Sequence, residues 1–246
     1  MSIGTIRFME TSAAAALPKY YVLKEQILTL IEDAAPGTLI PTERALAEQY
    51  GTSRTTVRQA IGELVAEGRL DRTQGRGTFV APPKVTHVRQ LTSFSDDAAS
   101  QGLTAAARIV DVSVLPADPA TARRLAVEPG TDIHRVERIR LVDGEPLAHE
   151  IAFLAGPLPD LARTVAERGS LYAALREDYG IRIAEVEDTV ETKLAGPAEV
   201  QLLDVEMGAP MLLVHRLGFT PEGRPVEWTE SVFRGDRFRF VARMHV

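Results

Sequence analysis

The first 70 residues contain three runs in which apolar residues recur at helical spacing. One run opens at Pro18, the next follows Thr42, and the third follows Ser53. The apolar positions are Leu23, Ile27, Leu30 and Ile31 in the first run, Ala45, Leu46 and Tyr50 in the second, and Val57, Ile61, Leu64 and Val65 in the third. Because residues three and four apart share one side of an α-helix, each run predicts a helix that buries one face.

The polar residues between these runs predict where the second and third helices begin and end. Thr42 and Ser53 are good N-cap residues, and Gly51 and Gly68 suit the left-handed conformation that often ends a helix. Only Thr52 separates Gly51 from Ser53, so a very tight turn joins the two helices. In a helix-turn-helix the second helix presents its N-terminal turn outward.

A short hairpin is predicted after the third helix. Arg69 to Thr73 and Thr78 to Ala81 are strand-like, and a Gln-Gly-Arg-Gly sequence at 74–77 separates them. Its glycines permit positive φ angles and a close approach to a phosphate backbone, with Arg72 and Arg76 beside them. The segment therefore has the order of a winged helix-turn-helix, expected over residues 18–81.

The outward-facing residues of this domain have the chemistry to read DNA. In the major groove Arg can grip a guanine edge, Thr can meet a phosphate or a thymine methyl, and Gln can pair with adenine. The helix N-terminus adds partial positive charge. Taken singly, the helix face could be merely solvated and the hairpin merely a turn, but their order and spacing together favour DNA binding. The candidate DNA-binding residues are Arg44, Ser53, Arg54, Thr55, Thr56, Arg58, Gln59, Arg72, Gln74, Gly75, Arg76 and Gly77.

The charge balance indicates that clustered arginines, rather than the net charge of the chain, would attract DNA. The chain of 246 residues has a net charge of −6, and of its 28 basic and 34 acidic residues nine of each lie in residues 1–82. The excess acidity falls in the remainder, where 19 basic residues face 25 acidic ones. DNA binding would therefore rest on the clustered arginines, and non-specific affinity is expected to be modest.

Composition narrows the class of protein further. The chain has no cysteine, which excludes disulfides, thiolate metal sites and cysteine nucleophiles. Its five histidines are scattered without a paired spacing, so neither a metal nor a cofactor is expected. No apolar run is long enough to cross a membrane, and residues 1–17 lack a signal-peptide pattern. These features predict a cytoplasmic protein with a flexible tail at 1–17.

Beyond residue 81 the pattern changes to alternating strands and short helices. Two prolines open an extended linker, expected over residues 82–90. The predicted strands span 108–115, 132–142, 147–154, 181–193, 210–219 and 225–233, with a last one ending at 246, and the predicted helices span 117–126, 170–180 and 196–203. Local hairpins with short helices between them favour an α+β fold with a largely antiparallel sheet, expected over residues 91–246.

Two arginines of this second part could hold an anion. Arg138 and Arg140 lie two apart on a predicted strand, so both side chains point to one face. Paired guanidinium groups suit a phosphate or a carboxylate. The alternative is that both are surface arginines paired with Glu137 or Asp143.

Other polar residues could complete a ligand site. Ser170 at a helix start offers a hydroxyl and free backbone amides, with Tyr172 nearby, although an ordinary N-cap would explain it equally. Glu150 and Glu227 follow the two hairpin turns and could accept hydrogen bonds from a sugar, an amine or an amide. Exposed strand carboxylates are the simpler alternative for this pair.

Several of these segments resemble a known family. Tyr20–Ile27, Pro41–Gly51, Ser53–Ala60 and Gln74–Val80 are similar to the DNA-binding domain of GntR-superfamily regulators. From about Leu91 onward, the segments 140–146, 169–172, 222–228 and 233–240 resemble the effector-binding UTRA domain of the HutC subfamily. Within it, the chain is most similar to N-acetylglucosamine regulators of the NagR and DasR type.

The resemblance implies a phosphorylated amino sugar as effector, such as glucosamine 6-phosphate or N-acetylglucosamine 6-phosphate. In such regulators two strand arginines, a Ser-Leu-Tyr motif and a hydroxyl residue after the linker hold the phosphate. This pattern falls here on Arg138, Arg140, Ser170, Tyr172 and one of Thr92, Ser93 or Ser95, of which Ser93 is preferred. Glu150 and Glu227 would meet the sugar. Phe233 stands where the family often has Tyr, which removes a hydroxyl contact and leaves the sugar identity open.

The resulting expectation is a homodimeric repressor that binds a pseudo-palindromic double-stranded DNA operator. Three alternatives stay open: a regulator for another effector class, a constitutive DNA binder with a degenerate pocket, and an enzyme. An enzyme of chorismate-lyase-like fold would use Arg138, Arg140, Glu150 and Glu227 as catalytic groups. No catalytic triad, metal motif or nucleotide loop supports this last alternative, so no catalytic residue is expected.

Overall fold

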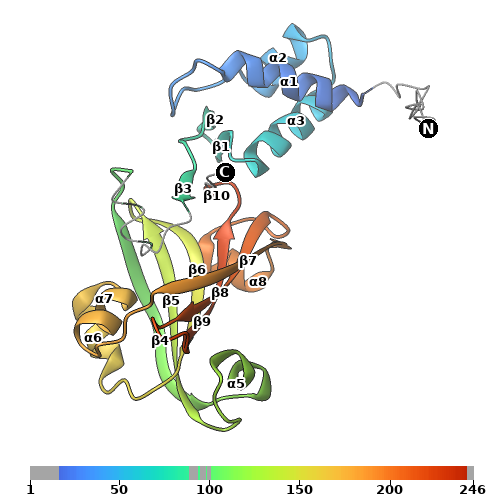
Figure 1. Ribbon diagram of the computed structural model, residues 1–246. Coiled ribbons are helices and arrows are strands. Elements are labelled where there is room, and N and C mark those ends of the chain that lie inside the picture. Colours follow the sequence, from blue (N-terminus) through green and yellow to red (C-terminus); the bar gives the residue numbers. More distant parts are fainter. Residues whose placement is uncertain (1–16, 89–93, 95–97, 99–100, 243–246) are drawn as a thin grey trace, which may run out of the picture. The chain divides into compact units, whose positions relative to one another are not determined.

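The computed structural model describes residues 17–88, 94, 98 and 101–242, and the chain divides into two compact units (Figure 1). The first unit comprises the residues up to Val65 together with Leu70–Val80, and the second comprises Ala66–Arg69 and all residues from Ala81 onward. None of the helices in this described part is long and apolar enough to cross a membrane. The tail expected at 1–17 lies, except for Leu17, outside the described residues.

The first unit contains three helices and a two-stranded hairpin. They are α1 (Lys19–Ile31), α2 (Glu43–Gln49), α3 (Arg54–Ala66), β1 (Leu70–Thr73) and β2 (Gly77–Val80). Both predicted N-caps are present, because Ala45 N–H donates to Thr42 Oγ1 at 3.3 Å and Thr56 N–H donates to Ser53 Oγ at 3.1 Å. Gly51 takes a positive φ of 59° in the tight turn between α2 and α3.

The apolar faces of the three helices form the core of this unit. Ile27, Leu46 and Ile61 are at most 1 % exposed and pack together in one cluster. Leu30 was predicted on the same face but is 43 % exposed. The buried arc of α1 is shifted toward Lys24, whose ammonium pairs with a glutamate of α3 at 3.2 Å, so Leu30 falls outside it.

A six-stranded antiparallel sheet forms the centre of the second unit, in the order β4-β5-β6-β9-β8-β7. Its strands are β4 (Ala105–Pro116), β5 (Asp132–Val142), β6 (Glu145–Leu154), β7 (Glu185–Leu194), β8 (Pro210–Phe219) and β9 (Pro225–Arg234). The helices are α5 (Pro119–Leu125), α6 (Leu161–Arg168), α7 (Leu171–Glu177) and α8 (Pro197–Leu203). The predicted α+β fold with a mainly antiparallel sheet is therefore confirmed.

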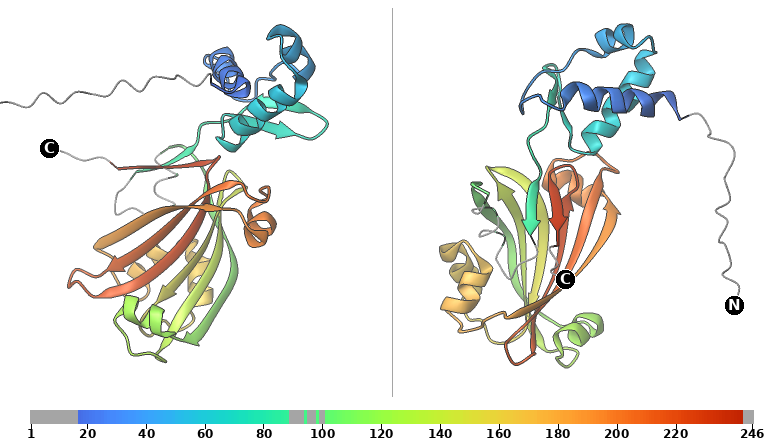
Figure 2. Two further views of the ribbon diagram at one scale, coloured as in Figure 1. Left: turned by 90° about the vertical axis from the view of Figure 1, so that its right-hand side faces the viewer. Right: turned by 45° about the horizontal axis from the view of Figure 1, so that its top comes forward.

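Helices pack against both faces of this sheet (Figure 2). Residues of α6 and α7 pack with Val136 on one face, whereas α8 packs with Ile139 on the other. Because side chains alternate along a strand, Arg138 and Arg140 project from the same face as Val136. The expected ligand site therefore lies on the face that α6 and α7 partly cover.

Besides shifts of a few residues at the ends of elements, three features differ from the predicted elements, and the last strand ends at Val241 rather than at 246. A small parallel pair joins β3 (Val85–Val88), inside the expected linker, to β10 (Phe238–Val241). Strand β7 begins at Glu185 rather than at 181, since the isoleucines at 181 and 183 pack against the cluster under α6 and α7. Helix α6 was not predicted, because its N-cap Asp160 has a left-handed φ of 55° and makes no side-chain cap.

Candidate functional site

The N-terminal turn of α3 presents the residues expected to read DNA bases. Arg54, Thr55, Arg58 and Gln59 are exposed, whereas Val57 between them is buried in the core. The turn is thus anchored from inside while four long or polar side chains extend into solvent. This geometry suits insertion of the helix end into a major groove.

Three further candidates make local contacts. The hydroxyls of Ser53 and Thr56 lie 2.8 Å apart at the start of α3. Arg44 on α2 is exposed and forms an ion pair with Glu48 at 3.9 Å. Exposed pairs of this kind are weak, so Arg44 can exchange Glu48 for a phosphate at low cost.

Two glycines shape the tip of the hairpin. Strands β1 and β2 pair antiparallel and leave Gln74, Gly75 and Arg76 in an exposed turn. The φ angle is 74° at Gly75 and 123° at Gly77, values that residues with a side chain rarely adopt. A Cβ at Gly77 would also lie 2.7 Å from Leu39 Cδ1. The wing therefore requires glycine at 77, and its tip carries an exposed arginine.

Glu43, the first residue of α2, links α3 to the β1–β2 hairpin. Its carboxylate accepts hydrogen bonds from Arg58 Nη2 of α3 at 3.0 Å and from Arg72 Nη2 of β1 at 2.5 Å. The hydrogen bond from Arg58 is the largest cause that lowers the pKa of Glu43, so this carboxylate is ionised at neutral pH. Sequence reasoning missed this residue because its partners lie 15 and 29 positions away.

Replacing Glu43 with Gln is expected to raise non-specific DNA affinity and to lower specificity. The change removes a negative charge from the expected DNA surface and frees Arg58 and Arg72 from a fixed orientation. Phosphate attraction is independent of sequence, so random duplex should bind more tightly while the ratio of specific to non-specific affinity falls. Fluorescence anisotropy with a specific and a random duplex measures both. An unchanged ratio would show that Glu43 does not orient the reading arginines.

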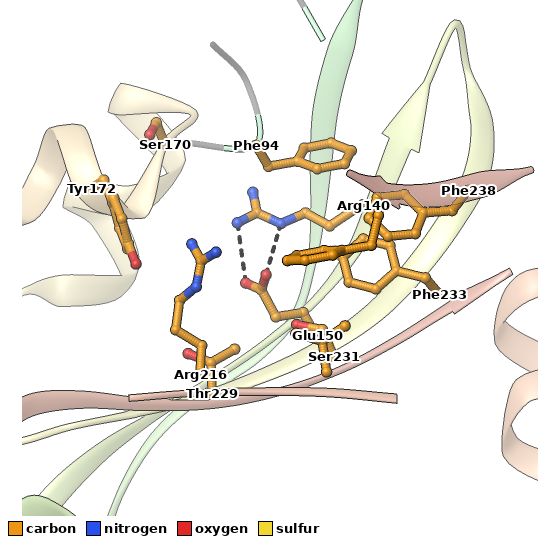
Figure 3. A pocket seen from close by; sticks show the side chains of 12 residues that line it. Phe94, Arg140, Glu150, Ser170, Tyr172, Arg216, Thr229, Ser231, Phe233 and Phe238 are labelled. Atoms are coloured by element: carbon orange, nitrogen blue, oxygen red, sulfur yellow. Dashed lines mark hydrogen bonds and ion pairs between the residues drawn. The ribbon is translucent and has the colours of Figure 1, made fainter. Parts of the chain in front are cut away.

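A cavity of about 640 Å³, counting its open mouth, lies beside α7 in the second unit (Figure 3). The polar lining residues are Arg140, Glu150, Ser170, Tyr172, Arg216, Thr229 and Ser231, and the apolar ones are Phe94, Val214, Phe233, Phe238 and Phe240. Five of the eight expected ligand residues thus line it. Arg138 and Glu227 are not among the lining residues, and Ser93 lies outside the described residues.

Glu150 on β6 is the centre of a buried ion cluster. It pairs with Arg138 Nη2 and accepts hydrogen bonds from Arg140 Nε at 3.2 Å and Nη2 at 3.1 Å. Burial alone would raise the pKa of this carboxyl, but the charges of the two arginines outweigh burial and lower it to about 2. Glu150 is therefore a carboxylate at neutral pH, held between two guanidinium groups.

Arg138 lies beneath the cavity wall rather than in it. It is 1 % exposed, and its Nε and Nη1 atoms have no hydrogen-bond partner within the part of the chain that the structure describes. Burial, and then the like charge of Arg140, lower the pKa of Arg138. A buried guanidinium with unengaged donors is costly, and a nearby anion would reduce that cost.

Glu227 on β9 supports the cavity wall from behind. It is 2 % exposed, and its two oxygens accept hydrogen bonds from the Tyr172 hydroxyl at 2.7 Å and the Thr229 hydroxyl at 3.0 Å. Burial raises the pKa of Glu227, the opposite direction to Glu150. The expectation that Glu227 meets the ligand directly is thus replaced by a geometry in which it orients two residues that line the cavity.

Arg216 on β8 lines the cavity although sequence reasoning did not single it out. Its Nε and Nη2 atoms donate to the two oxygens of Asp188 on β7, at 2.7 and 2.8 Å. Burial opposes the charged form, but the hydrogen bonds and charge of Asp188 raise the pKa of Arg216 above its usual range. The sequence feature that could have identified Arg216 is its place in the apolar run 210–219, where it shares a strand face with Val214.

The remaining wall of the cavity is aromatic. The rings of Phe233 and Phe238 stack with centroids 4.0 Å apart. The guanidinium carbon of Arg140 lies 5.2 Å from the centroid of the Phe94 ring. The cavity therefore combines a cationic, hydroxyl-rich side with an apolar side that suits the C–H face of a sugar ring.

Family comparisons match both parts of the chain. Residues 19–80 match the bacterial regulatory proteins of the gntR family, and residues 100–239 match the UTRA domain. The two matches cover the helix-turn-helix and most of the residues that line the cavity.

Individual relatives cover nearly the whole chain. The HTH-type transcriptional repressor NagR of Bacillus subtilis is 35% identical over 239 residues, covering 96% of this chain and 98% of that protein. The repressor PhnF of Mycolicibacterium smegmatis is 35% identical over 238 residues, covering 96% and 97%. The mannosyl-D-glycerate transport/metabolism system repressor MngR of Escherichia coli is 30% identical over 228 residues, covering 91% and 95%.

A solved structure agrees with these matches. The crystal structure of PhnF superimposes with a TM-score of 0.64 at 34% identity, covering 91% of this chain and 99% of that one. Relatives named as repressors confirm the expected regulator and speak against the enzyme alternative. The chain therefore belongs to the GntR family of bacterial transcriptional regulators, as a DNA-binding repressor of the branch that carries a UTRA effector domain.

Proposed function

We propose that operator binding by this repressor is controlled by a phosphorylated amino sugar, such as glucosamine 6-phosphate or N-acetylglucosamine 6-phosphate. The observation that carries the proposal is the cavity in which Arg140 lies with the hydroxyls of Ser170 and Tyr172 near an aromatic wall (Figure 3). The cationic side suits a phosphate ester and the aromatic side suits a sugar ring. The name of the relative MngR supports a sugar derivative as the effector class.

The other expected ligand residues have defined parts in this proposal. Ser93 stays a candidate phosphate contact outside the described residues. Glu150 accepts hydrogen bonds from ligand hydroxyl or ammonium groups at the cavity wall. Arg138 contributes positive charge from the layer beneath, and Glu227 acts through its two hydroxyl partners. Phe233 provides ring contact without a hydroxyl.

On the DNA side, we propose that the exposed turn of α3 reads base edges and that the wing approaches the phosphate backbone. A homodimer in the cytoplasm would place two such surfaces on a pseudo-palindromic operator, with half-sites about 34 Å apart or a multiple of it. Bound effector favours an arrangement of the effector domains that mis-spaces the two DNA-binding domains. Coupling of about 1–3 kcal/mol is the usual scale for such control.

A thermal-shift screen of the full-length protein tests the effector class. A ligand that binds only the folded protein raises its Tm by mass action. We expect either amino-sugar phosphate to raise the Tm, the unphosphorylated parent sugars to raise it much less at the same concentration, and Arg140→Ala and Ser170→Ala to remove most of the shift. Arg163→Ala, an exposed arginine on α6, is the matched control and should shift as the wild type does.

One result of this screen would contradict a phosphorylated effector. A Tm shift produced only by unphosphorylated ligands, such as histidine-pathway acids or fatty acids, would overturn the phosphate assignment. The repressor assignment, which rests on the family, would stand.

A further inference from the structure

Two guanidinium groups reach the cavity from different strands. Figure 3 shows that Arg140 on β5 and Arg216 on β8 point toward the same space, near Ser170 and Tyr172. Arg138, the neighbour expected from the sequence spacing, is 1 % exposed and does not line this space. We propose that Arg216 is a further guanidinium that contacts the anionic group of the effector. This inference rests on the proposed function, because it names a further contact in the same site.

Arg216 is held in position by a contact on its far side. Asp188 accepts from its Nε and Nη2 atoms, and this carboxylate is only 2 % exposed. Bidentate pairing fixes the plane of a guanidinium, so little side-chain freedom remains to be lost when a ligand binds. Arg216 also lies close enough to Tyr172 to oppose the rise in the pKa of that phenol. The charge of Arg216 therefore lies near the Tyr172 hydroxyl, which is expected to contact the phosphate.

The charge balance around the cavity favours a bound anion. The cluster contains three guanidinium groups and three carboxyl groups, counting Asp188 and Glu227. Only three of these groups line the cavity, the guanidinium groups of Arg140 and Arg216 and the carboxylate of Glu150, so positive groups outnumber negative ones on its surface. Uncompensated positive charge in a buried site is costly, and a dianionic phosphate ester offsets it better than a monoanionic carboxylate.

Isothermal titration calorimetry on the full-length protein tests this contact with three probes: glucosamine 6-phosphate, inorganic phosphate and glucosamine. Arg216→Gln is expected to weaken binding of both phosphate probes by about 10- to 150-fold, the range for a hydrogen bond to a charged group. Binding of glucosamine should change by less than about threefold, because it lacks the anion. Arg216→Lys should give an intermediate loss, since it keeps the charge without the planar fork.

A double variant tests whether a folding defect, rather than a lost anion contact, explains weaker binding by Arg216→Gln. Arg216→Gln leaves Asp188 buried without its partner, so Arg216→Gln combined with Asp188→Asn removes both charges of the pair together. Arg163→Gln on α6 is the control for removal of an arginine elsewhere.

Each outcome of the titrations has one meaning. If the wild type binds glucosamine 6-phosphate and Arg216→Gln and Arg216→Lys bind it equally well, Arg216 is not an anion contact. The effector assignment still stands in that case. If the variants weaken all three probes alike, the role of Arg216 is structural and the inference is wrong. If the wild type binds neither phosphate probe, the proposed effector class fails, and the anion contact fails with it.

Discussion

Replacing Glu150 with Gln is expected to lower the free energy of unfolding of the effector unit by about 3–5 kcal/mol. The carboxylate is the shared partner of Arg138 and Arg140, and all three side chains are buried. Removing it leaves two like charges inside the protein with no anion between them. Since domains are commonly stable by only about 5–15 kcal/mol, this loss is a large fraction of the total.

Urea unfolding followed by tryptophan fluorescence measures this loss. Trp228 on β9 is the one tryptophan of the chain, and its ring stacks on Phe153 at 5.2 Å, so its emission reports on the effector unit. Glu145→Gln, an exposed position on the same strand β6, is the matched control and should change stability by less than about 0.5 kcal/mol. A loss below about 1 kcal/mol for Glu150→Gln would contradict the role of the cluster.

The same cluster fixes the sign of the pH dependence. The pKa of Glu150 is about 2 in the folded protein against an ordinary value of 4.5. Its stabilisation is therefore fully present above pH 4.5 and is lost as the pH falls toward 2. The difference in stability between wild type and Glu150→Gln should shrink over that range. A difference that grew on acidification would show that Glu150 is not stabilised as an anion.

Replacing Arg54 with Ala is expected to weaken binding to a specific operator duplex by about 5- to 150-fold and to relax base preference at one position in each half-site. Arg54 is the first residue of α3 and is exposed at the end of the helix that we propose enters the groove. Fluorescence anisotropy with a duplex that the wild type selects from random DNA gives the change in Kd. Binding to random duplex should fall much less, because one phosphate contact at most is lost.

Two controls separate a reading defect from a folding defect in this variant. Arg163→Ala on α6 should leave the Kd for the specific duplex unchanged. Arg54→Ala should itself keep the wild-type thermal shift with glucosamine 6-phosphate, because the effector cavity lies in the other unit. A wild-type operator Kd for Arg54→Ala would contradict the assignment of α3 as the recognition helix.

Local sequence signals predicted the DNA-binding unit well because its geometry depends on near neighbours. The Thr42 and Ser53 caps bond to residues three positions on, and the apolar spacing of α3 places Val57 in the core and Arg58 outside. The antiparallel sheet followed from alternation and hairpin turns for the same reason. Strand alternation also placed Arg138 and Arg140 correctly on one face.

The parts that were not predicted depend on contacts between distant residues. Glu43 joins two arginines far along the chain, and Arg216 pairs with Asp188 from a neighbouring strand 28 positions away. Alternation shows on which face Arg138 and Glu227 lie, but not that packing places them behind the cavity wall. The parallel pairing of β3 with β10 likewise joins segments about 150 residues apart, for which no local pattern exists.

The most direct test of the regulatory claim is the operator affinity of the full-length protein with and without effector. The Kd for a duplex selected from random DNA is measured by fluorescence anisotropy while glucosamine 6-phosphate is titrated, with glucosamine as the control. We predict that saturating phosphate ester raises the Kd by about 5- to 150-fold and that glucosamine leaves it unchanged. A Kd that stays constant while thermal shift shows the ester bound would contradict control of DNA binding through this cavity.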